Sequence, residues 1–206
     1  GKKLVKEMNK VGVMVDVSHI SDEAFYQAVE ISDAPVIASH SSLRSYTPGF
    51  ERNMSDDMLK ALAKNEGVIQ INFGSSFLAE QANRYRDMMK KRITAVKEQY
   101  GEDSDEAKRR IKDIEANNPY PFATLDTVLD HIDHVRDLIG VEHIGVGSDY
   151  DGVGDSLPVG LKDVSTYPNL VQGLMDRGYS DKEIEMILGG NLMRVWEQVE
   201  DYAKTH

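Results

Sequence analysis

The sequence predicts an α/β fold, half of a (β/α)₈ barrel, in which each of four parallel strands is followed by helix. Four short runs rich in β-branched residues are bounded by polar turn residues, which is typical of buried strands. Segments with helical spacing separate these runs, and a strand–helix–strand order implies parallel strands joined by right-handed crossovers. This order fits either a (β/α) barrel or a doubly wound sheet. A complete barrel needs eight strands in typically ~250 residues, so half a barrel is the better match for four strands in 206 residues.

The predicted elements alternate along the chain. Strands are expected at Val11–Val17, Pro35–Ala38, Gly67–Gly74 and Gly140–Ser148. Helices are expected at residues 22–31, 56–64, 124–139, 161–176, 183–188 and 191–202. The first residues already have a helical pattern without a cap, which indicates a chain cut from something longer. We expect residues 1–206 to form a single domain, the second half of a barrel.

Residues 78–121 differ from the rest of the chain. They contain no long apolar run, and acidic and basic side chains are mixed in nearly equal number. Such a stretch is typical of solvated helices on a surface. We therefore predict a charged helical insertion within the barrel half, broken near residues 101–104.

The composition excludes several classes of function. The net charge of −11 provides no basic excess to neutralise phosphates, so a nucleic-acid partner is not expected. No apolar run approaches the ~20 residues of a membrane-spanning helix. The chain has no cysteine, so any bound metal must be held by histidines and carboxylates.

Two Ser-His pairs stand at the ends of the first two predicted strands. His19 ends the sequence Asp-Val-Ser-His, and His40 ends Ile-Ala-Ser-His. Because parallel strands end at the same edge of a sheet and neighbouring strands lie roughly 4.8 Å apart, both imidazoles can reach one metal ion. A single histidine there more often only caps its strand. Two in equivalent positions favour a metal site.

Asp149 directly follows the fourth predicted strand and so shares this edge. It could ligate a metal, accept a proton from water or anchor a substrate ammonium group; the alternative is a simple Asp-x-Asp-Gly turn. Arg52 lies in the loop after the second strand, where a guanidinium suits the bidentate capture of a carboxylate. His131 and His134 are interpreted as surface residues of a helix, and His143 as structural.

Six ordered motifs resemble the renal (membrane) dipeptidase family of metallopeptidases, over nearly the whole chain apart from the charged insertion. They are Asp16-Val-Ser-His-Ile-Ser, Val36-Ile-Ala-Ser-His-Ser-Ser, Arg52-Asn, Gly147-Ser-Asp-Tyr-Asp-Gly-Val, Gly160-Leu-Lys-Asp-Val-Ser-Thr-Tyr-Pro and Asn191-Leu-Met-Arg-Val. The resemblance implies a (β/α)₈ barrel that hydrolyses dipeptides with hydroxide activated by two zinc ions.

The resemblance also implies a role for each matching residue. His19 and His40 would bind the second zinc, Arg52 the substrate carboxylate, and Asp149 would act on the attacking water or the substrate amine. The family's His-x-Asp pair, bridging glutamate and further substrate-binding histidine have no counterpart in this sequence. The chain would therefore hold at most one of the two zinc ions and supply about half of the site.

Two hypotheses of different class follow. The chain is a catalytic half that needs the N-terminal half-barrel, in the parent chain or a companion chain, to cleave its dipeptide substrate. Alternatively, it is a non-catalytic metal- or ligand-binding half-barrel, or part of another metal-dependent amidohydrolase. Unpaired sheet edges would favour a homo-oligomer. The resemblance alone suggests an extracytoplasmic location, periplasmic or membrane-associated.

Overall fold

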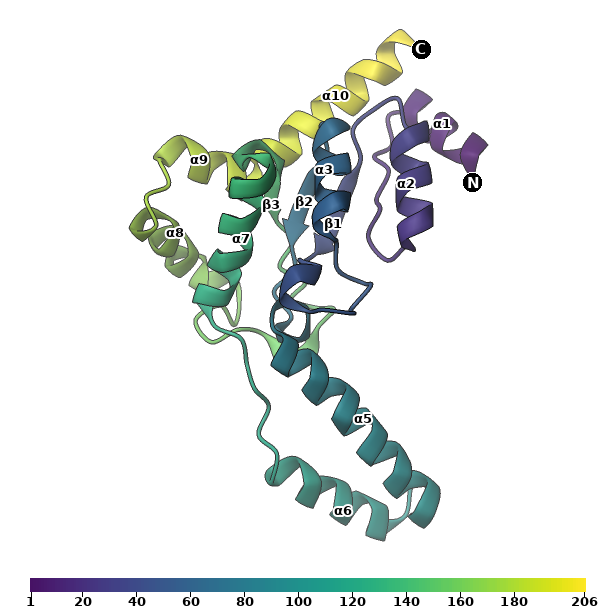
Figure 1. The fold of residues 1–206 in the computed structure, drawn as a ribbon, viewed down its shortest axis with the longest axis vertical. Coiled ribbons are helices and arrows are strands. Elements are labelled where there is room, and N and C mark those ends of the chain that lie inside the picture. The colour runs from purple at the N-terminus through teal and green to yellow at the C-terminus, as the bar shows by residue number, and fades with distance from the viewer.

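A parallel sheet with helices on both faces forms the body of the chain in the computed structural model, which describes residues 1–206 (Figure 1). The strands are β1 (Ile37–Ser41), β2 (Val68–Ile71) and β3 (Ile144–Val146), paired in that order. The helices are α1 (Lys2–Lys10), α2 (Asp22–Ile31), α3 (Asp56–Lys64), α4 (Ser75–Leu78), α5 (Glu80–Tyr100), α6 (Asp105–Ala116), α7 (Leu125–Ile139), α8 (Tyr167–Asp176), α9 (Asp181–Glu185) and α10 (Asn191–Thr205). Single 3₁₀ turns occur at Arg44–Tyr46, Val141–His143, Gly154–Ser156 and Val164–Thr166, and a π-helical segment at Met186–Gly190.

An extended segment before α2 occupies the fourth parallel position, beside β1. One bridge joins it to the sheet: Val17 N–H donates to the Ile37 carbonyl at 2.8 Å, and Ile37 N–H donates to the Val15 carbonyl at 2.9 Å. The backbone N–H and C=O of Asp16, between them, point away from β1 and have no backbone partner. The four parallel strand positions that the sequence predicts are therefore present, but the first is extended chain with a single bridge.

The boundaries of the strands differ from the predicted ones. The prediction ended the second strand at Ala38, whereas β1 continues to Ser41, so His40 lies within the strand. Its pairing with β2 changes register between Ala38 and Ser41. The fourth predicted strand began at Gly140, but a 3₁₀ turn takes its first residues and β3 begins at Ile144.

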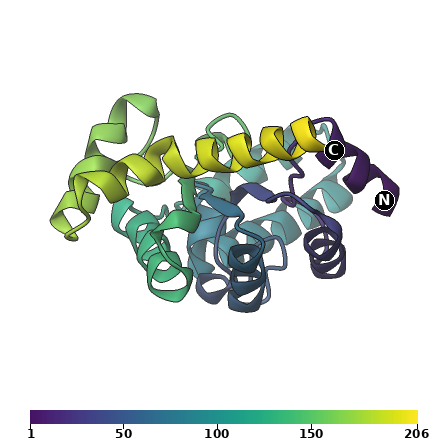
Figure 2. The same cartoon turned by 90° about the horizontal axis from the view of Figure 1, so that it is seen from above.

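Apolar side chains fix the layers because alternate strand residues face opposite sides of the sheet. On one face, Ala38, Ile69 and Ile144 belong to the main core together with buried side chains of α2, α3 and α7. On the other face, Ile37 and Val68 pack in a smaller cluster with Val195 and Val199 of α10. Helix α10 crosses the sheet and reaches α1, so both termini lie side by side (Figure 2).

A side chain closes part of the sheet edge at β3. Asn191 is buried, and its Nδ2 donates to the carbonyls of Val141 and Ile144 at 2.7 and 2.8 Å. Because an edge strand leaves such carbonyls without partners, the amide substitutes for a neighbouring strand at this point.

Helices α5 and α6 form a hairpin that projects from the body after β2 (Figure 1). The chain turns between them at Gly101, whose φ of +87° favours glycine. The two ends of the hairpin meet at its base: Ala123 N–H donates to Ser75 Oγ at 2.9 Å, and Tyr85 Oη donates to the Asn118 carbonyl at 2.7 Å. None of the helices, these included, is long and apolar enough to span a membrane.

Candidate metal and substrate site

His19 and His40 face each other at the carboxyl ends of their strand positions. Their Nε2 atoms are 2.7 Å apart, and the ring planes are inclined by 50°. His40 projects from β1, whereas His19 follows the extended segment with a φ of +68°, in the left-handed region that few residues with side chains adopt. The two histidines that the sequence places at this edge are thus in contact.

The histidine pair suits two positions of a metal site but not a whole one. Zinc bound tetrahedrally by nitrogens at 2.0–2.1 Å separates two ligand atoms by about 3.3 Å. The rings would therefore have to open by about 0.6 Å, well within side-chain rotation. No cluster of three or more histidine, cysteine or acidic side chains forms a metal site in the chain.

A chain of hydrogen bonds supports His40 from the side opposite His19. The His40 Nδ1 is 2.7 Å from Ser39 Oγ, and that hydroxyl donates to Asp16 Oδ2 at 2.5 Å. The other oxygen of Asp16, Oδ1, accepts the backbone N–H groups of Ser18 and Ser39 at 2.9 and 3.1 Å. These side-chain bonds replace the backbone ladder beyond Asp16, which is why the first strand position remains irregular.

The surroundings shift the pKa values of Asp16 and His19. Partial enclosure tends to raise the pKa of Asp16, but the hydrogen bonds from Ser39 and Ser18 outweigh it and lower that pKa below its usual range. Desolvation, with the charge of Arg52 next, lowers the pKa of His19. A lowered histidine pKa favours the neutral imidazole, which is the form that binds metals.

Arg52 lies against the carboxyl end of β1. Its Nη2 donates to the His40 carbonyl at 2.7 Å, its Nη1 donates to Ser41 Oγ at 2.8 Å, and its Nε is buried without a partner. The guanidinium also lies over the Phe77 ring, 5.5 Å from the centroid. Burial lowers the pKa of Arg52, yet an arginine stays charged in a protein, and each Nη keeps a second N–H.

Asp149 joins the same edge from the end of β3. Its Oδ2 accepts the Nδ2 of Asn72 at 2.8 Å, and Asn72, which follows β2, is fully buried. Asp149 also opens a turn, since Gly152 N–H donates to its carbonyl at 3.0 Å. A Cβ at residue 152 would collide with the Asp149 carboxylate, so any larger residue there would displace that side chain. The charge of Asp149 acts on both His19 and Arg52.

Three residues of this edge were not singled out from the sequence: Asp16, Ser39 and Asn72. Each was visible as a polar residue in or directly after a predicted apolar strand, close to a residue that was singled out. Their partners depend on the register between strands, which a pattern of apolar residues does not specify at single-residue precision.

The remaining histidines lie elsewhere. His143 is buried and its Nδ1 is 2.8 Å from the Gly67 carbonyl, in keeping with the predicted structural role. His134 pairs with Asp56 at 2.9 Å on the outside of α7. The prediction of a surface position is wrong for His131, which is fully buried under Tyr46.

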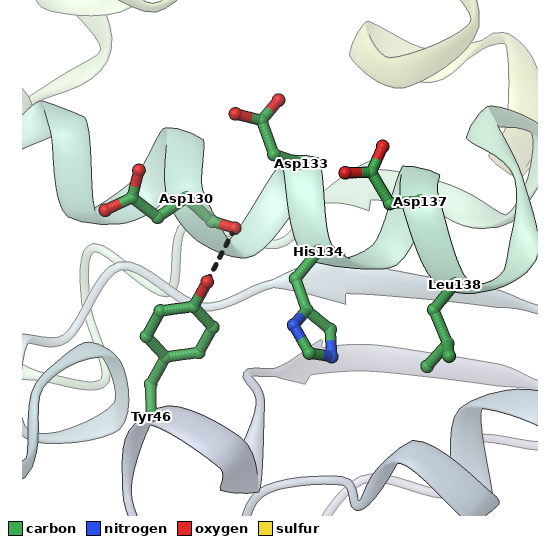
Figure 3. Close-up of a pocket in the computed structure, with 6 residues that line it drawn as sticks. All are labelled: Tyr46, Asp130, Asp133, His134, Asp137 and Leu138. Atoms are coloured by element: carbon green, nitrogen blue, oxygen red, sulfur yellow. Dashed lines mark hydrogen bonds between the residues drawn. The ribbon is translucent and has the colours of Figure 1, made fainter.

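A hollow of about 380 Å³ beside α7 is lined by acidic side chains that are already paired with arginines (Figure 3). Tyr46 Oη donates there to the Asp130 carbonyl, while the carboxylates of Asp130, Asp133 and Asp137 project from the helix. Arg177 pairs with the first two, and Arg136 with Asp137. These ion pairs account for the three acidic side chains without a bound cation.

Comparisons with known proteins agree with this architecture. Dipeptidase 3 of Mus musculus is 38% identical over 200 residues, which are 97% of this chain and 32% of that protein. Dipeptidase tcpJ of Claviceps purpurea is 37% identical over 203 residues, 98% of this chain and 38% of the relative. The chain thus spans about a third of the length of the curated relatives it matches.

Solved structures show the same fold. The probable dipeptidase PvdM from Pseudomonas aeruginosa superposes with a TM-score of 0.78 at 28% identity, over 98% of this chain and 54% of that one. A metallo peptidase from Rhodobacter sphaeroides, liganded with a phosphinate mimic of the dipeptide L-Ala-D-Ala, gives 0.72 at 28% identity, over 97% and 46%. A family model described as membrane dipeptidase (peptidase family M19) matches residues 1–206. The chain therefore belongs to the membrane dipeptidase family.

Proposed function

We propose that this chain supplies one half of the active site of a zinc-dependent dipeptidase. The observation that carries the proposal is the contact of His19 and His40 through their Nε2 atoms at the carboxyl ends of adjacent strand positions, where α/β folds bind their ligands. Membership of a dipeptidase family supports the reaction class. The relative bound to a dipeptide mimic supports a dipeptide as substrate.

The two histidines would hold one zinc ion through their Nε2 atoms. A bound zinc supplies Lewis acidity toward the peptide carbonyl and toward water. Further ligands, for this ion and for a second one, would come from residues outside this sequence, since no third ligand of the chain joins the pair. Zinc is the metal we propose because imidazole and carboxylate ligands suit it.

Arg52 and Asp149 would handle the substrate at the same edge. The two unused N–H groups on the Arg52 Nη atoms can donate to the free carboxylate of a dipeptide. Asp149, held by Asn72, would either take up the proton of the attacking water or bind the substrate ammonium group. An arginine and a carboxylate at one edge match the two charged ends of a dipeptide, which an internal peptide bond of a long chain lacks.

We further propose that residues 1–206 form half of a barrel with residues 78–121 as an insertion. The order of four parallel strand positions supports this arrangement. A companion half would close the barrel by pairing with both edges, at Asp16 and at β3, and at β3 its strand would meet the amide of Asn191. In the chain alone, a second copy would cover the open edge at Asp16.

Zinc binding to the chain itself tests the histidine pair. Titration calorimetry of the chain should show one weak zinc site that is lost in both His19→Ala and His40→Ala. His206→Ala, at an exposed histidine outside the site, serves as the control and should bind as the unmodified chain does. Two zinc ions per chain, together with dipeptide cleavage by the chain alone, would contradict the half-site.

Substrate analogues test the role of Arg52 in the complete enzyme. Arg52→Ala should raise KM for free dipeptides by about 10–100-fold, because hydrogen bonds between charged groups contribute about 1.5–3 kcal/mol. Dipeptides amidated at the carboxyl end should be affected little. Arg44→Ala is the matched control, since Arg44 in the preceding turn is bound to Asp22 through both Nη atoms. Equal effects on free and amidated substrates would refute the carboxylate contact.

A non-catalytic metal- or ligand-binding half-barrel is the second candidate. It is favoured by the ligand count, because two histidines alone hold a metal weakly and leave no bridge to a second ion. Supplying the missing half of the barrel distinguishes the two candidate functions. Dipeptide hydrolysis that depends on His19 supports the enzyme, whereas metal binding without hydrolysis supports the binding module.

A further inference from the structure

We propose that Asp16 and Ser39 are positioning residues that fix the proton of His40 on Nδ1 and so leave its Nε2 free to bind a metal. The three side chains form one line, from Asp16 Oδ2 through Ser39 Oγ to His40 Nδ1, with steps of 2.5 and 2.7 Å. This inference rests on the proposed function, because it assigns the histidine to a metal.

The direction of each hydrogen bond follows from the number of protons available. The ionised carboxylate of Asp16 can only accept, so the single hydroxyl proton of Ser39 must point to it. Ser39 Oγ can then only accept from the ring, which places a proton on His40 Nδ1. A neutral imidazole carries one N–H, so His40 Nε2 is left with a bare lone pair directed at His19.

The same argument gives His19 the opposite tautomer. Its Nε2 lies 2.7 Å from the bare Nε2 of His40 and must therefore donate to it. Its Nδ1 makes no hydrogen bond within the chain, so the proton can move there when a metal replaces the contact between the rings. The Nε2 of His40 is therefore already free to bind a metal, whereas the proton of His19 must first move from Nε2 to Nδ1.

Tautomers in the metal-free chain provide the first test. Long-range ¹H–¹⁵N correlation spectra of a ¹⁵N-labelled chain, recorded at about pH 8, distinguish protonated from bare ring nitrogens. We expect His40 with the proton on Nδ1 and His19 with the proton on Nε2. A wild-type chain with the His40 proton on Nε2 overturns the proposal.

Asp16→Asn provides the sharper test because it should reverse the direction of both hydrogen bonds between residue 16, Ser39 and His40. Asp16 Oδ1 already accepts two backbone N–H groups, so the amide oxygen of the variant takes that place and the NH₂ group faces Ser39 Oγ. Ser39 Oγ then accepts a hydrogen bond from that NH₂ group and donates its own hydroxyl hydrogen bond to His40 Nδ1, so the ring proton of His40 lies on Nε2. An isosteric change of this kind at an orienting carboxylate is known to trap the wrong histidine tautomer.

Matched serine variants separate positioning from packing. Ser39→Thr keeps the hydroxyl and should keep the Nδ1 proton of His40, whereas Ser39→Ala should give a mixture of tautomers. Ser32→Ala removes a buried hydroxyl at the other end of the crossover, bound to the Ala34 carbonyl at 2.6 Å, and should leave His40 unchanged. An unchanged His40 in a folded Asp16→Asn chain overturns the proposal.

Zinc titration of the same variants tests whether the hydrogen bonds from Asp16 through Ser39 to His40 affect metal affinity. Loss of a residue that orients a metal-binding histidine typically lowers affinity by about 10–100-fold, and we expect this for Asp16→Asn but not for Ser39→Thr. A wild-type chain with the expected tautomers that binds no zinc refutes the proposed function and leaves the tautomer assignment standing. Equal zinc affinity in Asp16→Asn and wild type overturns the metal-orienting role.

Discussion

The surroundings of His131 control its charge. The ring is fully buried, its Nε2 is 2.9 Å from the Leu78 carbonyl, and its Nδ1 accepts Leu43 N–H at 3.3 Å. Desolvation lowers the pKa of His131 from 6.5 to about 4. A second ring proton would have to point at the Leu43 N–H, so the native structure holds the neutral form.

Acidification should therefore destabilise the fold between pH 6.5 and about pH 4. In this window the unfolded chain binds a proton at residue 131 that the folded chain does not, so the free energy of unfolding falls as the pH falls. The shift from 6.5 to about 4 corresponds to about 3 kcal/mol. Urea unfolding at a series of pH values measures it.

Two variants isolate this contribution. His131→Phe should be less stable at neutral pH, because two buried backbone groups lose their partner, but its stability should depend less on pH across the window. His206→Gln, at the exposed C-terminal histidine, should keep the wild-type dependence. An equally steep dependence in His131→Phe would show that other groups cause it.

The contact between His19 and His40 could be predicted from the sequence because both follow apolar runs at one sheet edge. His131 was assigned to the surface although Val128 and Val135, three residues before it and four after it, are buried on the same face of α7. What covers its ring is the turn carrying Tyr46, which is distant in sequence and could not be predicted. The hydrogen bond between Asp16 and Ser39 could not be predicted either, because it depends on the register between two neighbouring strand positions.

Among the elements, the α5–α6 hairpin is the most separable. Within it only Ala82, Met89 and Ala107 are buried, and hydrogen bonds at its base join residues on its two sides. The charge pattern of the sequence was sufficient to predict this pair of helices. The irregular first strand position was not predictable, because Val11–Val17 is as apolar as a regular strand.

Replacing residues 86–117 with about six Gly/Ser residues should leave the body folded. The bond from Tyr85 Oη to the Asn118 carbonyl shows that the cut ends lie close together, and six residues span up to about 20 Å. We expect Tm to change by less than about 4 °C, with a lower helical signal in far-ultraviolet circular dichroism. Loss of cooperative unfolding would contradict an independent insertion.

For the whole molecule, the two edges of the sheet differ. The edge at Asp16 presents a free backbone N–H and C=O beside exposed Val11 and Val13. Such an edge favours pairing with another chain. At the β3 edge, the buried amide of Asn191 already binds the carbonyl of Ile144.

The chain alone should therefore self-associate through the Asp16 edge. Light scattering at micromolar concentrations should give a mass above that of one chain, and Val13→Lys should shift it toward the monomer because a lysine blocks edge pairing. Val164→Lys, at a more exposed valine on a different loop, should have no effect. A monomeric wild-type chain, or equal effects of both lysines, would contradict pairing at this edge.

The amide of Asn191 has a consequence for growth beyond a pair. Two copies joined by their Asp16 edges about a two-fold axis leave only β3 edges outside, and a strand arriving there must first displace two hydrogen bonds of a buried side chain. Such a closed pair cannot template further copies, unlike a head-to-tail contact that propagates. The buried amide of Asn191 thus allows two copies to pair at their Asp16 edges but hinders the addition of further copies at β3.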